Sequence, residues 1–212
     1  MDLVIAICSR GVLHSRTAES CDENLKQAGF AMKDIGLTWE RVWSHAKPIP
    51  EAQNDVTDKA LGLDPEAILF LEEDMVIPAQ GLAIMLDLLE RHEVVSARYK
   101  IRPGLWAHKL KEDGRMSYGG MGCLLVRSYI FKYLEKPYFR SDKRFEVDCL
   151  GYFRELCGET NGYGAQDIYF YYLLWKANIV AVLADVECDH LRVKKQGEPG
   201  TNVGWHEIEA IP

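Results

Sequence analysis

In Ile68-Leu69-Phe70-Leu71-Glu72-Glu73-Asp74-Met75-Val76-Ile77-Pro78, an uninterrupted apolar run ends abruptly in three carboxylates. Four consecutive apolar residues are typical of a strand that is covered on both faces, as in the parallel sheets of α/β proteins. Ligands of such sheets bind at the carboxyl ends of the strands. The stretch therefore predicts a buried strand that carries acidic side chains to the ligand-binding edge of a sheet.

The acidic triplet Glu72-Glu73-Asp74 has two interpretations. Clustered carboxylates repel one another where the dielectric is low, so a cation would stabilise them, and hard oxygen ligands favour Mg²⁺ or Mn²⁺. Charged residues are also ordinary at the ends of strands, where they form a solvated turn. The triplet alone leaves both the metal site and the plain turn open.

The composition is that of an ordinary globular protein. The 212 residues are 48% hydrophobic and 27% charged, which suits a single domain with one sizeable core. The formal net charge of −7 argues against binding to nucleic acid over a wide surface, although a local basic patch is compatible with it. An anionic ligand would need a cation to offset this charge.

The cysteines and the N-terminus bear on the compartment. Six cysteines, at positions 8, 21, 123, 149, 157 and 188, include no CxxC pair, so we expect reduced thiols in the core. The apolar run from Met1 to Cys8 has no basic leader and is too short for a signal peptide or a spanning helix. We therefore expect a cytoplasmic protein without a membrane partner.

Strands and helices alternate through the first half of the chain. Apolar runs predict strands, and amphipathic patterns that stop at glycines such as Gly29 and Gly62 predict helices. The predicted strands cover residues 3–8, 39–43, 68–71 and 94–99, and the predicted helices cover 17–28, 51–61 and 79–91. This order favours an α/β fold with a mostly parallel sheet.

Beyond residue 99 the expected elements are shorter. Residues 106–111 and 115–118 flank the turn Glu112-Asp113-Gly114, which predicts an antiparallel hairpin. Glycines at 119, 120 and 122 precede an apolar run at 123–126, and they either form a turn or let a ligand approach the backbone. A helix from about Gln166, a strand at 179–183 and an extended run to His190 follow.

Two residues of this half are candidate functional groups. Asp167 lies in the first turn of an apolar helix that follows a glycine-containing loop. The helix dipole favours an acid there, so a capping role and a functional role both stay open. His190 ends an extended run, where it is either a metal ligand or a core histidine bonded to a backbone group.

The acidic triplet, the glycine loop with Asp167 and the strand ending in His190 together resemble the GT-A-type glycosyltransferases, over roughly Leu3 to His190. Glu72-Glu73-Asp74 resembles their DxD-type motif, with Glu72 in place of the first Asp. Gly164-Ala165-Gln166-Asp167 resembles their Gly-x-Glu-Asp segment, with Gln166 in place of the Glu. His190 falls where several members place a further metal ligand, and Gln53-Asn54 falls in the helix that commonly carries Arg-Asn.

This resemblance implies a fold and a set of roles. The fold is a GT-A-like, Rossmann-type sheet, mostly parallel and flanked by helices, in one catalytic domain over residues 1–190. Asp74, Glu72 and His190 would hold Mn²⁺ or Mg²⁺, and Asp167 would be the base, as in the inverting, family-two-like members. The implied donor-binding residues are Ser9, Arg10, Asn54, Glu73, Arg192 and Lys194, and the implied acceptor-side residues are Gly120, Gly164 and Gln166.

The composition turns basic and glycine-rich from Arg192 onward, with Lys194 and Lys195. Residues 191–212 are expected to form a basic C-terminal tail. The tail is either a lid that folds over the diphosphate or a solvated terminus.

The resemblance implies a metal-dependent glycosyltransferase that moves a sugar from a nucleoside-diphosphate sugar, with a UDP-sugar favoured, to an acceptor hydroxyl. A non-catalytic nucleotide-sugar-binding module is an alternative that Glu72 and Gln166 would permit. A metal-dependent nucleotidyltransferase is another, although no glycine-rich, lysine-containing phosphate loop lies near the N-terminus. The acceptor is open and includes nucleic acid or a nucleotide. If Asp167 only caps its helix, Glu159 and Asp148 are the next candidates for the base.

Overall fold

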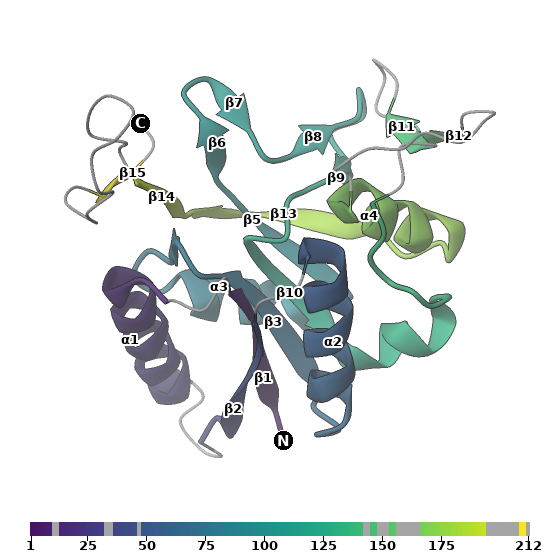
Figure 1. The fold of residues 1–212 in the computed structure, drawn as a ribbon. Coiled ribbons are helices and arrows are strands. Elements are labelled where there is room, and N and C mark those ends of the chain that lie inside the picture. Colours follow the sequence, from purple (N-terminus) through teal and green to yellow (C-terminus); the bar gives the residue numbers. More distant parts are fainter. Residues whose placement is uncertain are drawn as a thin grey trace.

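A six-stranded sheet forms the centre of the computed structural model, which describes residues 1–9, 13–31, 36–45, 48–141, 145–147, 153–155, 166–193 and 208–210 (Figure 1). In spatial order its strands are β13 (Ala181–Glu187), β5 (Val94–Arg98), β10 (Cys123–Arg127), β3 (Ala67–Glu72), β1 (Leu3–Ser9) and β2 (Trp39–His45). Strand β10 is antiparallel to both of its neighbours, whereas every other adjacent pair is parallel. The predicted α/β fold with a mostly parallel sheet is confirmed.

Helices cover both faces of this sheet. One face is covered by α1 (Ser15–Ala31) and α3 (Gly81–Leu89), and the other by α2 (Ile49–Leu61), α4 (Gln166–Lys176) and the 3-10 helix η1 (Ser128–Tyr133). In β1, Leu3, Ile5 and Ile7 pack toward α1 while Val4 and Ala6 pack toward α2. Each large side chain so buried stabilises the fold by about 1.5–3 kcal/mol, which explains why the central strands are continuous apolar runs.

The described residues bear on two further expectations. Four of the cysteines, Cys8, Cys21, Cys123 and Cys188, lie in this part of the chain and form no disulfide. For these four the prediction of reduced thiols is met. Among the described residues, no helix has both the length and the apolar character that crossing a membrane requires.

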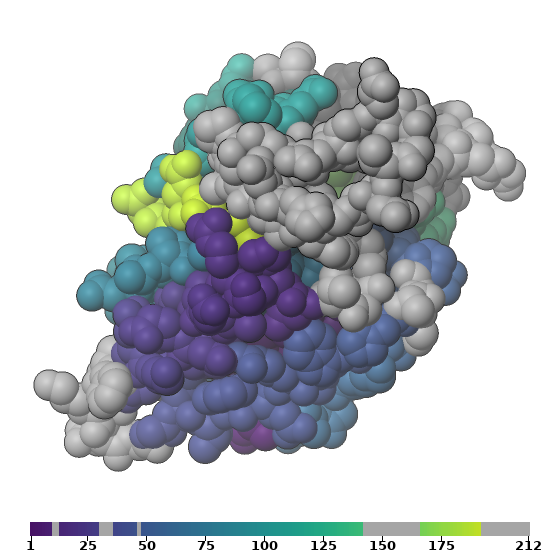
Figure 2. Space-filling model, turned by 60° about the vertical axis from the view of Figure 1, so that its left-hand side comes forward, coloured from purple at the N-terminus to yellow at the C-terminus, as the bar shows by residue number. Residues whose placement is uncertain are grey.

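The turn after β3 lies beside a strand from near the C-terminal end of the chain. Strand β4 (Met75–Val76) pairs antiparallel with β14 (Asp189–Val193), so that His190 lies opposite Met75. The backbone N–H of Leu191 donates to the carbonyl of Asp74 at 2.8 Å. In Figure 2 yellow-green residues from the segment that contains β13 and β14 lie beside purple residues of the N-terminal part of the chain. Arg16 of α1 lies 3.6 Å from Asp189 of β14.

The C-terminal region differs from the expected division at residue 190. Strand β14 runs across that boundary, and β15 (Ile208–Ala210) pairs antiparallel with residues 191–193. Strand β14 pairs with β4 at residues 189–190 and with β15 at residues 191–193, so both of its halves have hydrogen-bond partners. Residues 191–193 and 208–210 therefore belong to a three-stranded sheet rather than to a continuous tail.

Small antiparallel hairpins lie beyond β5. They are β6 (Lys100–Arg102) with β7 (Leu105–Trp106), β8 (Lys109–Leu110) with β9 (Met116–Tyr118), and β11 (Phe145–Val147) with β12 (Phe153–Glu155). The hairpin predicted around Glu112-Asp113-Gly114 is confirmed as β8–β9. The β6–β7 hairpin was not predicted, and its turn uses Gly104 at a φ of +74°, a value that favours glycine.

Candidate metal and catalytic site

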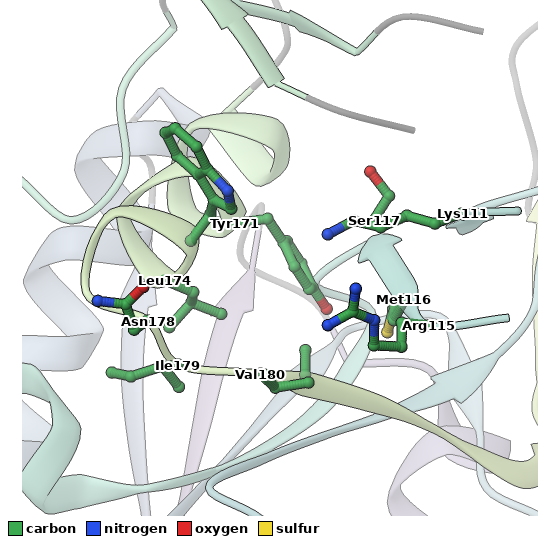
Figure 3. Close-up of a pocket in the computed structure, with 11 residues that line it drawn as sticks. Lys111, Arg115, Met116, Ser117, Tyr171, Leu174, Asn178, Ile179 and Val180 are labelled. Atoms are coloured by element: carbon green, nitrogen blue, oxygen red, sulfur yellow. The ribbon is translucent and has the colours of Figure 1, made fainter. Parts of the chain in front are cut away.

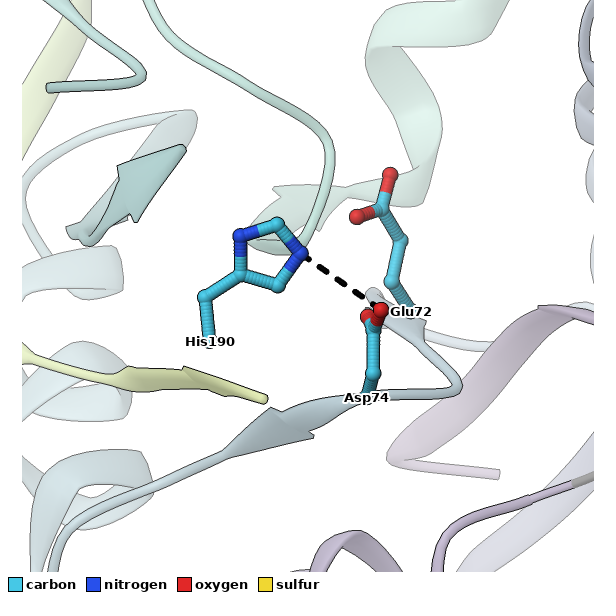
Figure 4. A group of neighbouring side chains, drawn as sticks. All are labelled: Glu72, Asp74 and His190. Atoms are coloured by element: carbon cyan, nitrogen blue, oxygen red, sulfur yellow. Dashed lines mark ion pairs between the residues drawn. The ribbon is translucent and has the colours of Figure 1, made fainter. Parts of the chain in front are cut away.

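Three potential metal ligands converge where β3 ends. Glu72 is the last residue of β3, Asp74 lies in the turn to β4, and His190 reaches them from β14. Their ligand atoms all lie within 4.8 Å of one another, and Nε2 of His190 is 3.5 Å from Oδ2 of Asp74 (Figure 4). The structure thus brings together the three residues that the sequence suggested as metal ligands.

The backbone around His190 fixes its orientation. The ring donates from Nδ1 to the carbonyl of Lys100 at 3.1 Å, which directs Nε2 toward Asp74 and the other acid of the cluster. The ring of Tyr99 meets the imidazole edge to face, with the centroids 5.5 Å apart. The histidine is therefore held in the tautomer and direction that a metal ligand needs.

The charges of this cluster are poorly neutralised by protein groups. Burial, together with the nearby carboxylates of Asp167 and Asp74 and against the opposing charge of His190, raises the pKa of Glu72 to about 8. Burial lowers the pKa of His190, but Asp74 and Glu72 outweigh it, so the net change is upward. Two carboxylates and one imidazole within 4.8 Å of one another form a donor set that a divalent cation such as Mn²⁺ or Mg²⁺ fits.

Asp167 approaches the same edge from the first turn of α4. Burial raises its pKa to about 6. Hydrogen bonds from the side chain of Gln53 and the backbone of Met121 act in the opposite direction, and so does one from the neighbouring Gln166. Within the described part of the chain, Oδ1 of Asp167 is buried without a hydrogen-bond partner. One carboxylate oxygen is therefore held by amides while the other is left to accept a proton or a hydrogen bond.

Gln53 is a site residue that the sequence analysis named only beside Asn54 and gave no role. Its side chain is 2% exposed and lines a small pocket with Cys8, Glu72 and Met121. Its Oε1 is buried with no partner among the described residues. A signal was available, because the buried face of α2 consists of Ala52, Gln53, Val56, Thr57 and Ala60, and a glutamine in an otherwise small or apolar stripe is unusual.

Asn54, by contrast, has a structural explanation. Its Nδ2 donates to the carbonyls of Pro50 and Phe139 at 2.8 Å each, and its Oδ1 accepts from the backbone N–H groups of Tyr138 at 2.8 Å and Phe139 at 3.2 Å. These four bonds fill the hydrogen-bonding capacity of the amide. The geometry does not favour the donor-binding role implied for Asn54, and its neighbour Gln53 faces the site instead.

The glycines before β10 make room for Tyr99. A Cβ at Gly120 would lie 1.9 Å from Oη of Tyr99, and one at Gly122 would lie 2.8 Å from the same atom. The backbone N–H of Gly122 also donates to that hydroxyl at 3.0 Å. Because Tyr99 packs on His190, these glycines support the metal cluster indirectly, and the acceptor-side role of Gly120 stays a prediction.

The remaining predicted residues lie as follows. Ser9 is the last residue of β1 and is buried at the same edge of the sheet. Glu73 is 6% exposed, inside the turn, and its carbonyl accepts from the N–H of His14 at 3.0 Å. Gln166 begins α4 beside Asp167. The structure does not describe the remaining candidates. They are Arg10, Gly164, Lys194, the side chain of Arg192, and the alternative bases Asp148 and Glu159.

A larger pocket lies toward the other end of α4. It has a volume of about 280 Å³ and is bordered by Lys111 and Arg115 on one side and by Tyr171 and Leu174 on the other (Figure 3), and Trp175 also lines it. None of its lining residues belongs to the metal cluster, and Asp167 is not among them. The candidate site is thus the carboxylate edge of the sheet and not this pocket.

Comparison with known proteins identifies the fold. No protein-family model matches the sequence, and no curated protein matches it either. Among solved structures, A197 from STIV is similar over 98% of this chain and 100% of its own, with a TM-score of 0.57 and 14% identity. GalNAc-T7 with UDP, GalNAc and Mn²⁺ is similar over 90% of this chain and 44% of its own, with a TM-score of 0.55 and 8% identity.

A third similar structure is S. aureus TarS 1-349 in complex with UDP-GlcNAc. It matches 93% of this chain and 60% of its own, with a TM-score of 0.54 and 13% identity. This chain thus spans less than two thirds of the TarS and GalNAc-T7 chains. Together these likenesses show that the chain has a GT-A-type glycosyltransferase fold, while identities this low establish the fold alone.

Proposed function

We propose that the chain is a divalent-metal-dependent glycosyltransferase that moves a sugar from a nucleoside-diphosphate sugar, with a UDP-sugar favoured, to an acceptor hydroxyl. The observation that carries this proposal is the convergence of Glu72, Asp74 and His190 at the carboxyl end of β3 in a GT-A-type fold. The presence of UDP and Mn²⁺ in the GalNAc-T7 structure and of UDP-GlcNAc in the TarS structure supports the choice of ligands.

On the donor side, Glu72, Asp74 and His190 would hold Mn²⁺ or Mg²⁺. When bound, the cation would link the protein to the diphosphate and offset the charge that develops on this leaving group. Lys100 positions His190 through its carbonyl. Ser9 at the end of β1 is proposed to contact the nucleotide, with Arg10, Arg192 and Lys194 as further predicted contacts.

On the acceptor side, Asp167 is proposed as the general base. Its free Oδ1 would take the proton of the acceptor hydroxyl while the hydroxyl oxygen bonds to the anomeric carbon and the bond to the diphosphate breaks. A pKa of about 6 leaves the carboxylate mostly ionised at pH 7 and still more basic than an ordinary aspartate. Attack on the face opposite the diphosphate would invert the anomeric configuration.

Nucleotide binding tests the donor half of this proposal. UDP should raise the melting temperature of the protein in Mn²⁺ or Mg²⁺ and fail to do so in a chelator, since the acidic cluster repels the phosphates when no cation is present. Asp74→Asn is the matched variant, and it should behave in Mn²⁺ as the parent does in chelator. Equal stabilisation by UDP with and without metal would contradict the metal site.

A panel of UDP-sugars and other sugar nucleotides then tests catalysis. Release of UDP from one of them in Mn²⁺, stimulated by an acceptor, is the expected result. A sugar nucleotide that binds tightly but releases no UDP under any condition would instead indicate the non-catalytic binding module. The two outcomes are distinguished by measuring binding calorimetry and UDP release on the same samples.

A further inference from the structure

The segment from β6 to β9 carries a charge opposite to that of the whole protein. Its basic residues are Lys100, Arg102, Lys109, Lys111 and Arg115, and its acidic residues are Glu112 and Asp113, in a chain whose net charge is −7. Asp113 is paired with Arg115 at 2.6 Å. The segment, residues 100–118, is called the β6–β9 surface below, and it forms a local positive patch on an acidic protein.

Large aliphatic side chains of the same segment are exposed. Ile101 is 37% exposed, Leu105 is 38% exposed and Leu110 is 43% exposed. They lie on three successive short strands, whereas Ala107 and Met116 of this segment are buried. Exposed aliphatic residues grouped among basic ones indicate a surface that meets a partner.

This surface is preformed. In the β6–β7 hairpin Arg102 lies opposite Leu105, and Lys100 lies opposite Trp106 with its ammonium 5.3 Å from the ring centroid. The N–H of Ala107 donates to the carbonyl of Tyr99 at 2.9 Å, which fastens the end of the hairpin to the strand before it. The backbone that carries its basic and aliphatic side chains is therefore held in place by these contacts.

The β6–β9 surface also adjoins the candidate site. The carbonyl of Lys100 receives the hydrogen bond of His190, and β6 begins two residues after β5 ends. Figure 1 shows β6 and β7 standing beyond the end of the central sheet, on the same side as β14. A partner bound there would lie next to the metal cluster.

The mixture of side chains selects the class of partner. Single-stranded nucleic acid is bound by cationic grooves with exposed aromatic platforms. Within residues 100–118 the exposed large side chains are aliphatic and Trp106 lies under a lysine, and the exposed Trp175 adjoins the segment only at the pocket beside Lys111 and Arg115. The interface of an anionic bilayer accepts both components, because aliphatic side chains enter the boundary of the acyl chains while lysine and arginine stay at the lipid phosphates. The acidic remainder of the protein would be repelled from the same bilayer.

We propose that the β6–β9 surface docks this protein on an anionic lipid bilayer, with Ile101, Leu105 and Leu110 in the headgroup region and the basic side chains on lipid phosphates. Docking in this way needs no spanning segment, so it replaces the expectation that a membrane is not a partner. It is separate from sugar transfer, and it can fail while that function stands.

Flotation of the full chain with vesicles tests the proposal. Vesicles of phosphatidylcholine with about 30% phosphatidylglycerol should bind the protein, and vesicles of phosphatidylcholine alone should bind it at least about tenfold less. Raising NaCl from about 0.1 M to about 0.5 M should weaken the binding, since the Debye length shortens. The variant with Ile101→Ser, Leu105→Ser and Leu110→Ser should also lose about tenfold or more.

Matched variants distinguish binding through this surface from nonspecific binding to vesicles. Ile49→Ser with Ile84→Ser removes aliphatic side chains that are 39% and 42% exposed elsewhere, on α2 and α3, and it should bind as the parent does. Arg102→Gln, Lys109→Gln and Lys111→Gln combined should lose binding, whereas Lys26→Gln, Arg91→Gln and Lys132→Gln combined should keep it. Melting curves confirm that each variant is folded.

Three results would overturn the proposal. The first is that the parent does not bind the phosphatidylglycerol vesicles at low salt. The second is that the matched control variants lose as much vesicle binding as the test variants. The third is that the protein binds a single-stranded oligonucleotide and the vesicles do not compete with it. The last of these would assign the surface to nucleic acid.

Discussion

The cluster of Glu72, Asp74 and His190 and the pair of Asp167 and Gln53 are two acidic regions of one site, but they are built differently. The cluster lies where β3 ends and β14 begins, and its acids lie close to each other and to an imidazole. Asp167 starts a helix, and its neighbour is the neutral amide of Gln53. Burial raises the pKa of both Glu72 and Asp167, but the charges nearest to Glu72 act in the same direction, whereas the hydrogen-bond donors nearest to Asp167 act against burial.

This difference suggests how one residue type serves two roles. Carboxylates crowded against each other are stabilised by a cation, so they suit metal binding. A single carboxylate whose one oxygen is held by amide donors, and whose other is free, suits proton transfer. The following predictions test this division of labour, and they begin with the largest expected effect.

Asp74→Asn should abolish the metal-dependent part of donor binding, with a loss of affinity for UDP in Mn²⁺ of about 100-fold or more. The amide keeps the shape of the side chain but lacks the charge that anchors the cation. Calorimetry with UDP in Mn²⁺ and in chelator measures the effect, and Asp87→Asn, an exposed change on α3, is the control. Retained metal dependence would mean that Asp74 is not a ligand.

Asp167→Asn should leave UDP binding near the parental value and lower sugar transfer by about 100-fold or more, the usual contribution of a positioned base. Slow hydrolysis of the donor by water should persist, since the cluster is intact. Single-turnover transfer, measured beside donor affinity, separates the two regions. Transfer at the parental rate would reduce Asp167 to a helix-capping acid and direct attention to Glu159 and Asp148.

Gln53→Met should raise the pKa of Asp167 above its value of about 6, because the mutation removes a donor that favours the ionised form. A hydrogen bond to a charged group contributes about 1.5–3 kcal/mol, so the acid limb of the pH profile of transfer should move up by about one unit or more. Glu51→Met on the exposed side of α2 is the control. An unchanged acid limb would show that Gln53 does not act on Asp167.

Glu72→Gln should have the smallest effect among these variants. It should raise the melting temperature of the metal-free protein. The folded-state pKa of Glu72 is raised to about 8, so the unfolded chain holds fewer protons between roughly pH 4.5 and 8, and stability falls as pH rises through that window. Each kcal/mol recovered should raise the melting temperature by about 2–4 °C. A chelated melting curve at pH 8 is the measurement, and a lower melting temperature would contradict it.

The same residue predicts how metal affinity depends on pH. Binding to Glu72 requires the ionised carboxylate, so Mn²⁺ binding should release a proton and weaken as the pH falls below about 8. Calorimetry in buffers of different ionisation enthalpy detects the proton. Affinity that is flat from pH 6 to about 8.5 would place Glu72 outside the coordination sphere.

Local patterns were sufficient to predict much of the site. An apolar run that ends in acids identified β3 and placed Glu72 and Asp74 at its edge, because a strand buried on both faces must be apolar until it reaches the rim. The helix that begins near Gln166 could be predicted in the same way. The role of Gln53 could also have been predicted, since its position in the helical repeat places it on the buried face of α2. The resemblance pointed to the neighbouring Asn54 instead.

Other features have no local signal. The apolar run of β10 predicts a strand but not its direction, and β10 is antiparallel to both of its neighbours. The two-residue strands β4 and β7 are too short to show a period. Strand β15 lies in a segment whose composition is typical of a solvated terminus. Its backbone pairs with β14, and no local pattern in its sequence predicts this pairing.

The sequence by itself determined which residues form strands and helices in the first half of the chain, because side-chain periodicity and glycine stops act over a few neighbouring residues. Only the tertiary structure decided that His190 faces Asp74, that Gln53 reaches Asp167, and that Ile101, Leu105 and Leu110 stay exposed beside lysines and arginines. Contacts of this kind join segments far apart in the chain. They depend on strand register and helix packing, which are set by burying the whole core at once and not by any one stretch.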